Sequence, residues 1–82
     1  MSRVYRWIIG LHPGAASPDE QALASAGLRI VERHAHTDGA CLLAESQAPL
    51  STESLAGLRR LRGVAYVEAD QVIELPPQPG AG

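Results

Sequence analysis

Apolar residues fill both sets of alternate positions in residues 4–11. One set holds Tyr5, Trp7, Ile9 and Leu11, and the other holds Val4, Ile8 and Gly10. Because side chains alternate across a strand, this pattern predicts a central strand with two largely apolar faces. Ala40–Ala44 is also apolar on both faces and predicts a second central strand, followed by a loop over Glu45–Pro49.

Two other segments combine helical start signals with helical spacing. Ser17-Pro18-Asp19-Glu20 predicts a helix start, with a Ser N-cap and Pro in the first turn, and Gly27 is placed to end that helix. Ser51 predicts a second N-cap, and Gly63 marks the end of that segment. The second helix has a buried face of Leu55, Leu58 and Leu61, and its arginines, Arg59, Arg60 and Arg62, suit the negative end of the helix dipole.

The remaining apolar segments predict two more strands. Leu28–His36 has a charged outer half that suits a sheet edge, and Asp38-Gly39 predicts a tight hairpin turn after it. A last strand starts at Val64 and runs into an apolar end with Val72, Ile73 and Leu75. Because side chains alternate across a strand, we expect Glu68 and Asp70 to share the face of Tyr66.

This order of elements predicts an α+β, ferredoxin-like βαββαβ fold. Right-handed crossovers place two helices on one face of a four-stranded antiparallel sheet, with the first and third strands in the middle. The helices cover one face, so an apolar face is left open, and such a face favours a protein contact. Trp7 lies either in the core or on that open face. Residues 1–75 are predicted to form the domain, and residues 76–82 a Pro/Gly-rich flexible tail.

Composition excludes some classes of function. The chain has 82 residues, seven basic and nine acidic, and a net charge of −2, which argues against a nucleic-acid partner. No apolar run is long enough for a membrane span, and a single cysteine, Cys41, excludes an internal disulfide. We expect a cytoplasmic protein if Met1 is the native start, and a secreted one if the chain belongs to a protease precursor.

The sequence predicts no catalytic or metal site. Glu68 and Asp70 have no nucleophile or partner base fixed near them by spacing. The residues that could hold zinc, His12, His34, His36 and Cys41, include only two on one predicted strand face, and a structural zinc site needs about four ligands in suitable geometry. We therefore expect a protein that is not an enzyme and that uses no cofactor.

Three stretches resemble the inhibitor I9 family, which contains the propeptides of subtilisin-like serine proteases and their free-standing inhibitor relatives. Tyr5–Leu11 resembles the family's opening strand, and Asp38–Leu43 resembles its hairpin, with Asp in place of Asn and no aromatic residue. Leu58–Asp70 resembles its leucine-bearing helix followed by Val-x-x-Val-Glu-x-Asp. The resemblance covers about Val4 to Leu75, and its last part is the most specific.

The resemblance implies a way of binding. The open sheet face would pack on two surface helices of the protease, whose N-termini Glu68 and Asp70 would cap. The C-terminal segment would lie in the substrate cleft as a strand, with Leu75 in the primary specificity pocket and Val72 in an apolar pocket. The expected partner-binding residues are Tyr66, Glu68, Asp70, Val72, Ile73, Glu74 and Leu75.

Pro76–Gly82 depart from the family pattern, because inhibitors and cleaved propeptides of the family end near Leu75. Either Pro76 protects the preceding bond from cleavage, or the tail begins a linker to a catalytic domain. A different class of function also fits the open face: a ferredoxin-like module that forms a homodimer through it and inhibits no protease.

Overall fold

The computed structural model describes residues 2–15, 18, 20–36 and 39–75. The strands are β1 (Ser2–Leu11), β2 (Arg29–His36), β3 (Gly39–Ser46) and β4 (Val64–Leu75). The helices are α1 (Glu20–Ser25) and α2 (Thr52–Arg59). This order confirms the predicted βαββαβ arrangement.

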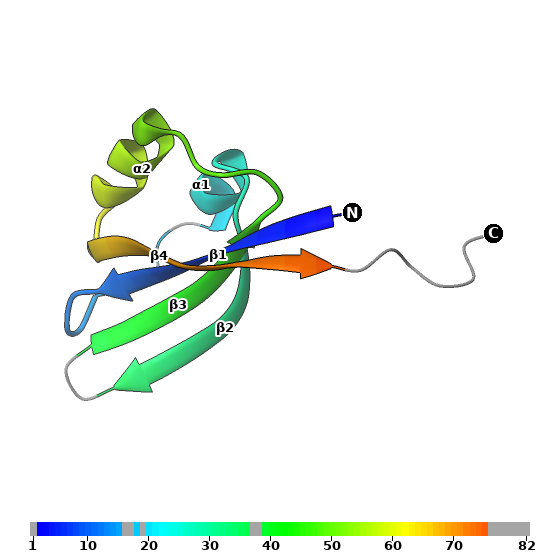
Figure 1. Ribbon diagram of the computed structural model, residues 1–82. Helices are drawn as coiled ribbons and strands as arrows, with labels where there is room; N and C mark the ends of the chain where they lie inside the picture. Colours follow the sequence, from blue (N-terminus) through cyan, green and yellow to red (C-terminus); the bar gives the residue numbers. More distant parts are fainter. Residues whose placement is uncertain (1, 16–17, 19, 37–38, 76–82) are drawn as a thin grey trace.

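The four strands form one antiparallel sheet in the order β2-β3-β1-β4. Both helices lie over the same face of this sheet, above it in Figure 1. The fold is therefore the predicted α+β, ferredoxin-like one, with β1 and β3 in the centre. No helix in the described part of the chain is long and apolar enough to cross a membrane.

The core lies between the sheet and the helices. Ile9, Leu23 and Leu42 are the largest side chains that are almost completely buried, and they come from β1, α1 and β3. The rest of the buried apolar cluster is Trp7, Leu11, Leu28, Ala44, Leu58, Val64 and Val67. Burying apolar surface stabilises the fold by about 25 cal/mol per Å². On each central strand, one set of alternate side chains is therefore buried in the core.

Local signals fix the helix ends. The Ser51 hydroxyl accepts a hydrogen bond from the Ser54 backbone N–H at 3.0 Å and caps α2 as predicted. Gly27 has a positive φ of 85°, and the N–H of Leu28 donates to the carbonyl of Leu23, so α1 ends in a Schellman turn. The predicted N-cap Ser17 lies outside the described residues, as does the hairpin residue Asp38. Pro18 was expected in the first helical turn, but it lies before α1, which begins at Glu20.

The strands differ from their predicted bounds, β2 by one residue at its start and the other three by more. β1 begins at Ser2 rather than Val4, and β3 continues to Ser46, so Glu45 belongs to a strand and not to a loop. β4 is one strand of 12 residues, and it pairs with β1 as far as Ser2 opposite Leu75. The predicted apolar end of the chain is thus part of the sheet, because the longer β1 provides partners for it.

Candidate protein-binding face

The sheet face away from the helices is formed by rows of side chains that the strand register brings together. Directly paired residues of antiparallel strands point to the same face. One row contains Cys41, Gly10 and Tyr66, the next contains Leu43, Ile8 and Glu68, and further rows contain Glu45, Arg6 and Gln71, then Val4 and Ile73. The aliphatic members, Val4, Ile8, Leu43 and Ile73, are only half-buried. No element in the described part of the chain covers this open face.

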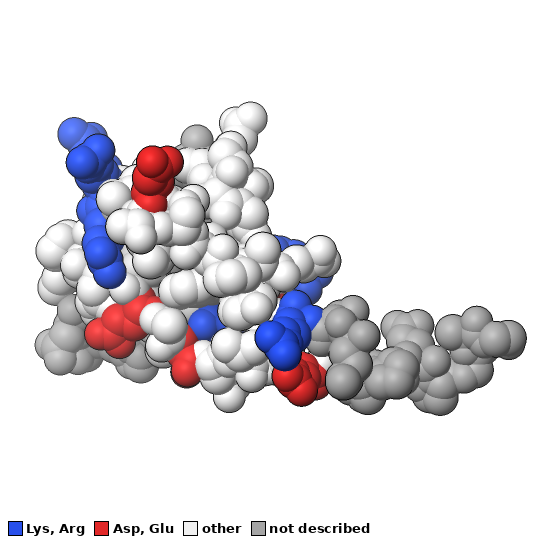
Figure 2. All heavy atoms as spheres, turned by 45° about the horizontal axis from the view of Figure 1, so that its top comes forward, with Lys and Arg blue, Asp and Glu red and all other residues white. Residues whose placement is uncertain are grey.

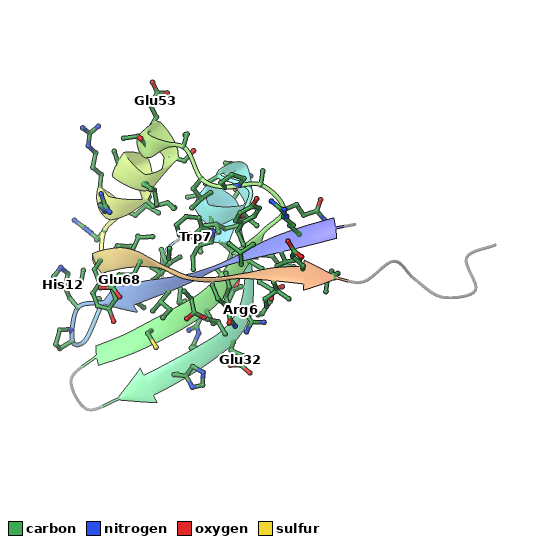
Figure 3. All side chains as sticks on the ribbon, viewed as in Figure 1. Arg6, Trp7, His12, Glu32, Glu53 and Glu68 are labelled. Carbon is green, nitrogen blue, oxygen red and sulfur yellow. The ribbon has the colours of Figure 1, made fainter. Side chains whose placement is uncertain are left out.

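Trp7 belongs to the helix side and not to the open face. Its side chain is 8% exposed, and its indole N–H donates to the hydroxyl of Ser46 at 3.0 Å. Figure 3 shows Trp7 toward the helices, whereas the neighbouring Arg6 lies on the other side of the sheet. The sequence allowed Trp7 either in the core or on the open face, and in the structure it lies in the core.

Tyr66 lies over a glycine on the open face. A Cβ atom added to Gly10, its partner in β1, would lie only 2.1 Å from Cε1 of the Tyr66 ring. The ring thus occupies the space that a side chain at position 10 would need, and it is still 44% exposed. The sheet therefore limits the positions that the Tyr66 ring can take on the open face.

The acidic pair does not follow simple alternation along β4. Glu68 is opposite Ile8 and lies on the open face, near Tyr66. The register then shifts: Trp7 pairs with Ala69 and Arg6 with Gln71, which leaves Asp70 without a partner in β1. Gln71 therefore occupies the next position of the open face, so the alternation from which we placed Asp70 beside Glu68 is broken at that residue. Both carboxylates are exposed.

The C-terminal part of β4 forms a two-stranded arm with the start of β1. Val72 is opposite Tyr5 and Ile73 opposite Val4, so they lie on different faces. Val72 and Leu75 are 55% and 43% exposed, and they also lie on different faces of the strand. Arg3 and Glu74 form an exposed ion pair of 3.3 Å across the arm. β4 is the edge strand, so no strand in the described residues pairs with its outer edge.

A charged cluster on the open face was absent from the sequence prediction. The Arg6 guanidinium donates to Oε2 of Glu45 at 2.9 Å, and Arg29 lies 3.5 Å from Oε1 of the same carboxylate. The Glu45 and Arg6 side chains are only 17% and 27% exposed. The expected loop over Glu45 hid this contact, because only the longer β3 brings Glu45 opposite Arg6.

The histidine and cysteine candidates do not converge on a metal. His34 is opposite Cys41 and lies 3.0 Å from the Glu32 carboxylate, both near the β2 edge of the open face. In the described ranges, no group of three or more His, Cys, Asp or Glu side chains is placed to hold a metal ion. The side chain of His36 lies outside the described part.

The chain was compared with protein-family models, curated proteins and solved structures, and none of the three comparisons gave a match. The fold and the order of strands agree with the fold that the resemblance to the inhibitor I9 family implies.

Proposed function

We propose that this protein binds a subtilisin-like serine protease through its open sheet face and strand β4. It acts either as an inhibitor or as a propeptide-like folding assistant. The observation that carries this proposal is the half-buried apolar face over β1 and β3, which the two helices leave uncovered. A partner that packs on this face buries apolar surface, and such burial drives association.

The acidic end of the face supports a helix-bearing partner. Glu68 is exposed beside the apolar row of Ile8 and Leu43, and Asp70 is exposed in the register shift of the same strand. Exposed carboxylates at the border of an apolar face can accept hydrogen bonds from the free N–H groups of a partner helix N-terminus. The motif resemblance assigns this role to Glu68 and Asp70.

The C-terminal segment contributes an extended strand. Residues 72–75 are already in β conformation, and their outer edge has unpaired backbone groups. A strand of the substrate cleft can add to that edge, with Val72, Ile73, Glu74 and Leu75 giving side-chain contacts. Holding the segment in one conformation reduces the entropy that is lost on binding.

Steady-state inhibition of a broad-specificity subtilisin by the purified chain tests this function. We expect tight inhibition, and mass spectrometry of the mixture then reports whether the bond between Leu75 and Pro76 stays intact. An intact bond indicates a free-standing inhibitor, whereas inhibition that fades as the chain is cut indicates a propeptide-like role. A folded, uncut chain that does not inhibit contradicts the proposal.

The acidic residues provide a second test. Because Glu68 and Asp70 are exposed, Glu68→Ala and Asp70→Ala should leave the fold intact and weaken inhibition. Circular dichroism checks the fold, and the inhibition constant checks the role. Unchanged inhibition by both variants removes the helix-capping role.

A homodimer through the open face is the competing function, since the same apolar surface would drive it. Size-exclusion chromatography with light scattering separates the two. A stable dimer that does not dissociate in the presence of protease supports self-association and contradicts the proposed inhibition.

A further inference from the structure

Arg6 is a half-buried cation near the middle of the open face. It extends from the central strand β1, with the apolar Ile8 and Leu43 on one side and Val4 and Ile73 on the other. Figure 3 shows Arg6 on the side of the sheet away from the helices. A side chain at this place would be covered completely when a partner packs on the face.

The hydrogen-bonding capacity of Arg6 is only partly used. A guanidinium has five N–H donors in a fixed fork. Its Nη2 donates to Glu45, whereas its Nε is buried and has no hydrogen-bond partner in the described part of the chain. Among the described residues, Gln71 faces Arg6 from β4 but forms no hydrogen bond with it.

This arrangement has no evident advantage for the isolated fold. Apolar side chains often replace a buried ion pair with no loss of stability, and a buried donor without a partner is costly. The cluster of Arg29, Glu45 and Arg6 has two positive charges and one negative charge. Arg29 is 80% exposed and its charge is solvated, whereas Arg6 is 27% exposed, shares the single Glu45 carboxylate and keeps spare N–H donors, which favour an acceptor oxygen of a partner packed on the face.

We infer that Arg6 is an anchor of the docking face and that the partner places an acceptor oxygen, a carboxylate or an exposed carbonyl, against its guanidinium. Glu45 acts as a positioning residue, since its carboxylate accepts a hydrogen bond from the guanidinium at 2.9 Å. Central arginines that become fully desolvated are frequent hot spots of protein interfaces. This inference rests on the proposed function and names the chemistry that the protease surface must present at this point.

Exchange of the pair is the sharpest test. Arg6→Glu combined with Glu45→Arg keeps an ion pair between β1 and β3 and leaves the net charge at −2. We expect the double variant to fold, because the attraction across the strands remains, but to inhibit the same subtilisin about thirtyfold less well or worse. Arg6→Lys keeps the positive charge but not the forked N–H donors of the guanidinium, so it should weaken inhibition less than the double variant does.

Two controls make the result interpretable. Thermal unfolding of the double variant shows whether the exchanged pair supports the fold. Arg60→Glu at the C-cap of α2 changes an exposed cation away from the open face, and this variant should inhibit like the original chain.

The outcomes separate the two claims. If the original chain inhibits and the folded double variant inhibits equally well, Arg6 has only a structural role and the inference is wrong. If Arg6→Glu with Glu45→Arg does not fold, Arg6→Met with Glu45→Met replaces it, and equal inhibition by that pair also contradicts the inference. If the original chain binds no protease, the proposed function fails and the inference fails with it.

Discussion

At the scale of single residues, one contact on each face of the sheet holds a large aromatic side chain in place. On the helix side, the indole N–H of Trp7 has one partner, the hydroxyl of Ser46, which itself donates to the carbonyl of Ala48 at 2.7 Å. On the open side, Gly10 gives the Tyr66 ring its place. Both contacts join residues far apart in the sequence, so each helps to fix the register of the strands.

Gly10→Ala should displace the Tyr66 ring, because the new methyl group would occupy the position of the ring atoms. The ring is partly exposed and can move into solvent, so we expect a loss of about 1 kcal/mol in the free energy of unfolding. Binding of the protease should weaken as well. Urea denaturation measures the first effect. Gly57→Ala in α2 is the matched control: nothing lies within 4 Å of its added Cβ, so stability should rise by about 0.5–1 kcal/mol.

Ser46→Ala leaves the buried indole N–H of Trp7 without a partner. We expect a loss of about 1–3 kcal/mol in the free energy of unfolding, measured by denaturation followed through the fluorescence of the single tryptophan. Ser25→Ala removes an exposed hydroxyl that donates to the Gln21 carbonyl, and it should change stability by less than about 0.5 kcal/mol. Equal effects of the two variants would contradict the importance of the Trp7 contact.

At the scale of elements, the unusual feature is the two-stranded arm that residues 2–4 of β1 and residues 73–75 of β4 form beyond the end of β3. The segment expected to lie in a protease cleft is paired with β1 in the chain itself. An exposed ion pair such as Arg3–Glu74 contributes little, about 0–1 kcal/mol, and a two-stranded ribbon is marginal by itself. The arm is therefore the part of the sheet that opens most easily.

A disulfide across the arm tests whether the arm stays closed on binding. Val4→Cys with Ile73→Cys joins directly opposite residues, and Cys41→Ala removes the competing thiol. We expect the oxidised variant to inhibit within about threefold of its own reduced form, because the outer edge of β4 remains free. Inhibition that disappears on oxidation and returns on reduction would show instead that residues 72–75 leave β1 to enter the cleft.

At the scale of the whole molecule, three exposed arginines gather near the end of α2, and three exposed carboxylates lie along β4. Arg59, Arg60 and Arg62 are exposed around the end of α2 and form no ion pair within the described ranges. Figure 2 shows blue atoms gathered at the left of the helix layer. The edge strand β4 carries Glu68, Asp70 and Glu74, all exposed. Like charges on β4 disfavour edge-to-edge pairing of two copies, which protects this edge against aggregation. An uncharged or basic strand can still pair with it.

Deletion of residues 72–82 should separate the fold from the function. The buried apolar cluster ends at Val67, so we expect the shortened chain to fold, with somewhat lower stability because residues 2–5 lose their partner strand. Circular dichroism and tryptophan fluorescence check the fold. Inhibition should be lost. Full inhibition by the shortened chain would remove the C-terminal segment from the binding mechanism, and a dimer that persists without it would favour self-association.

The sequence by itself determined the type and order of the elements. Two-sided apolar alternation placed β1 and β3 at the centre, and Ser51 and Gly27 marked helix ends, whereas α2 ends at Arg59 and not at the predicted Gly63. These signals are local: they depend on side-chain periodicity, on caps and on the backbone freedom of glycine, all of which act within a few residues.

Only the tertiary structure decided which face holds Trp7, where β4 shifts its register, and that Arg6 meets Glu45. The register shift at Asp70 depends on how β4 pairs with β1, so alternation within β4 could not predict it. Arg6 and Glu45 are 39 residues apart in the chain, and their contact exists because β3 continues two residues beyond its apolar run. Local patterns thus specify the strands, whereas the pairing between strands decides which side chains the open face presents to a partner.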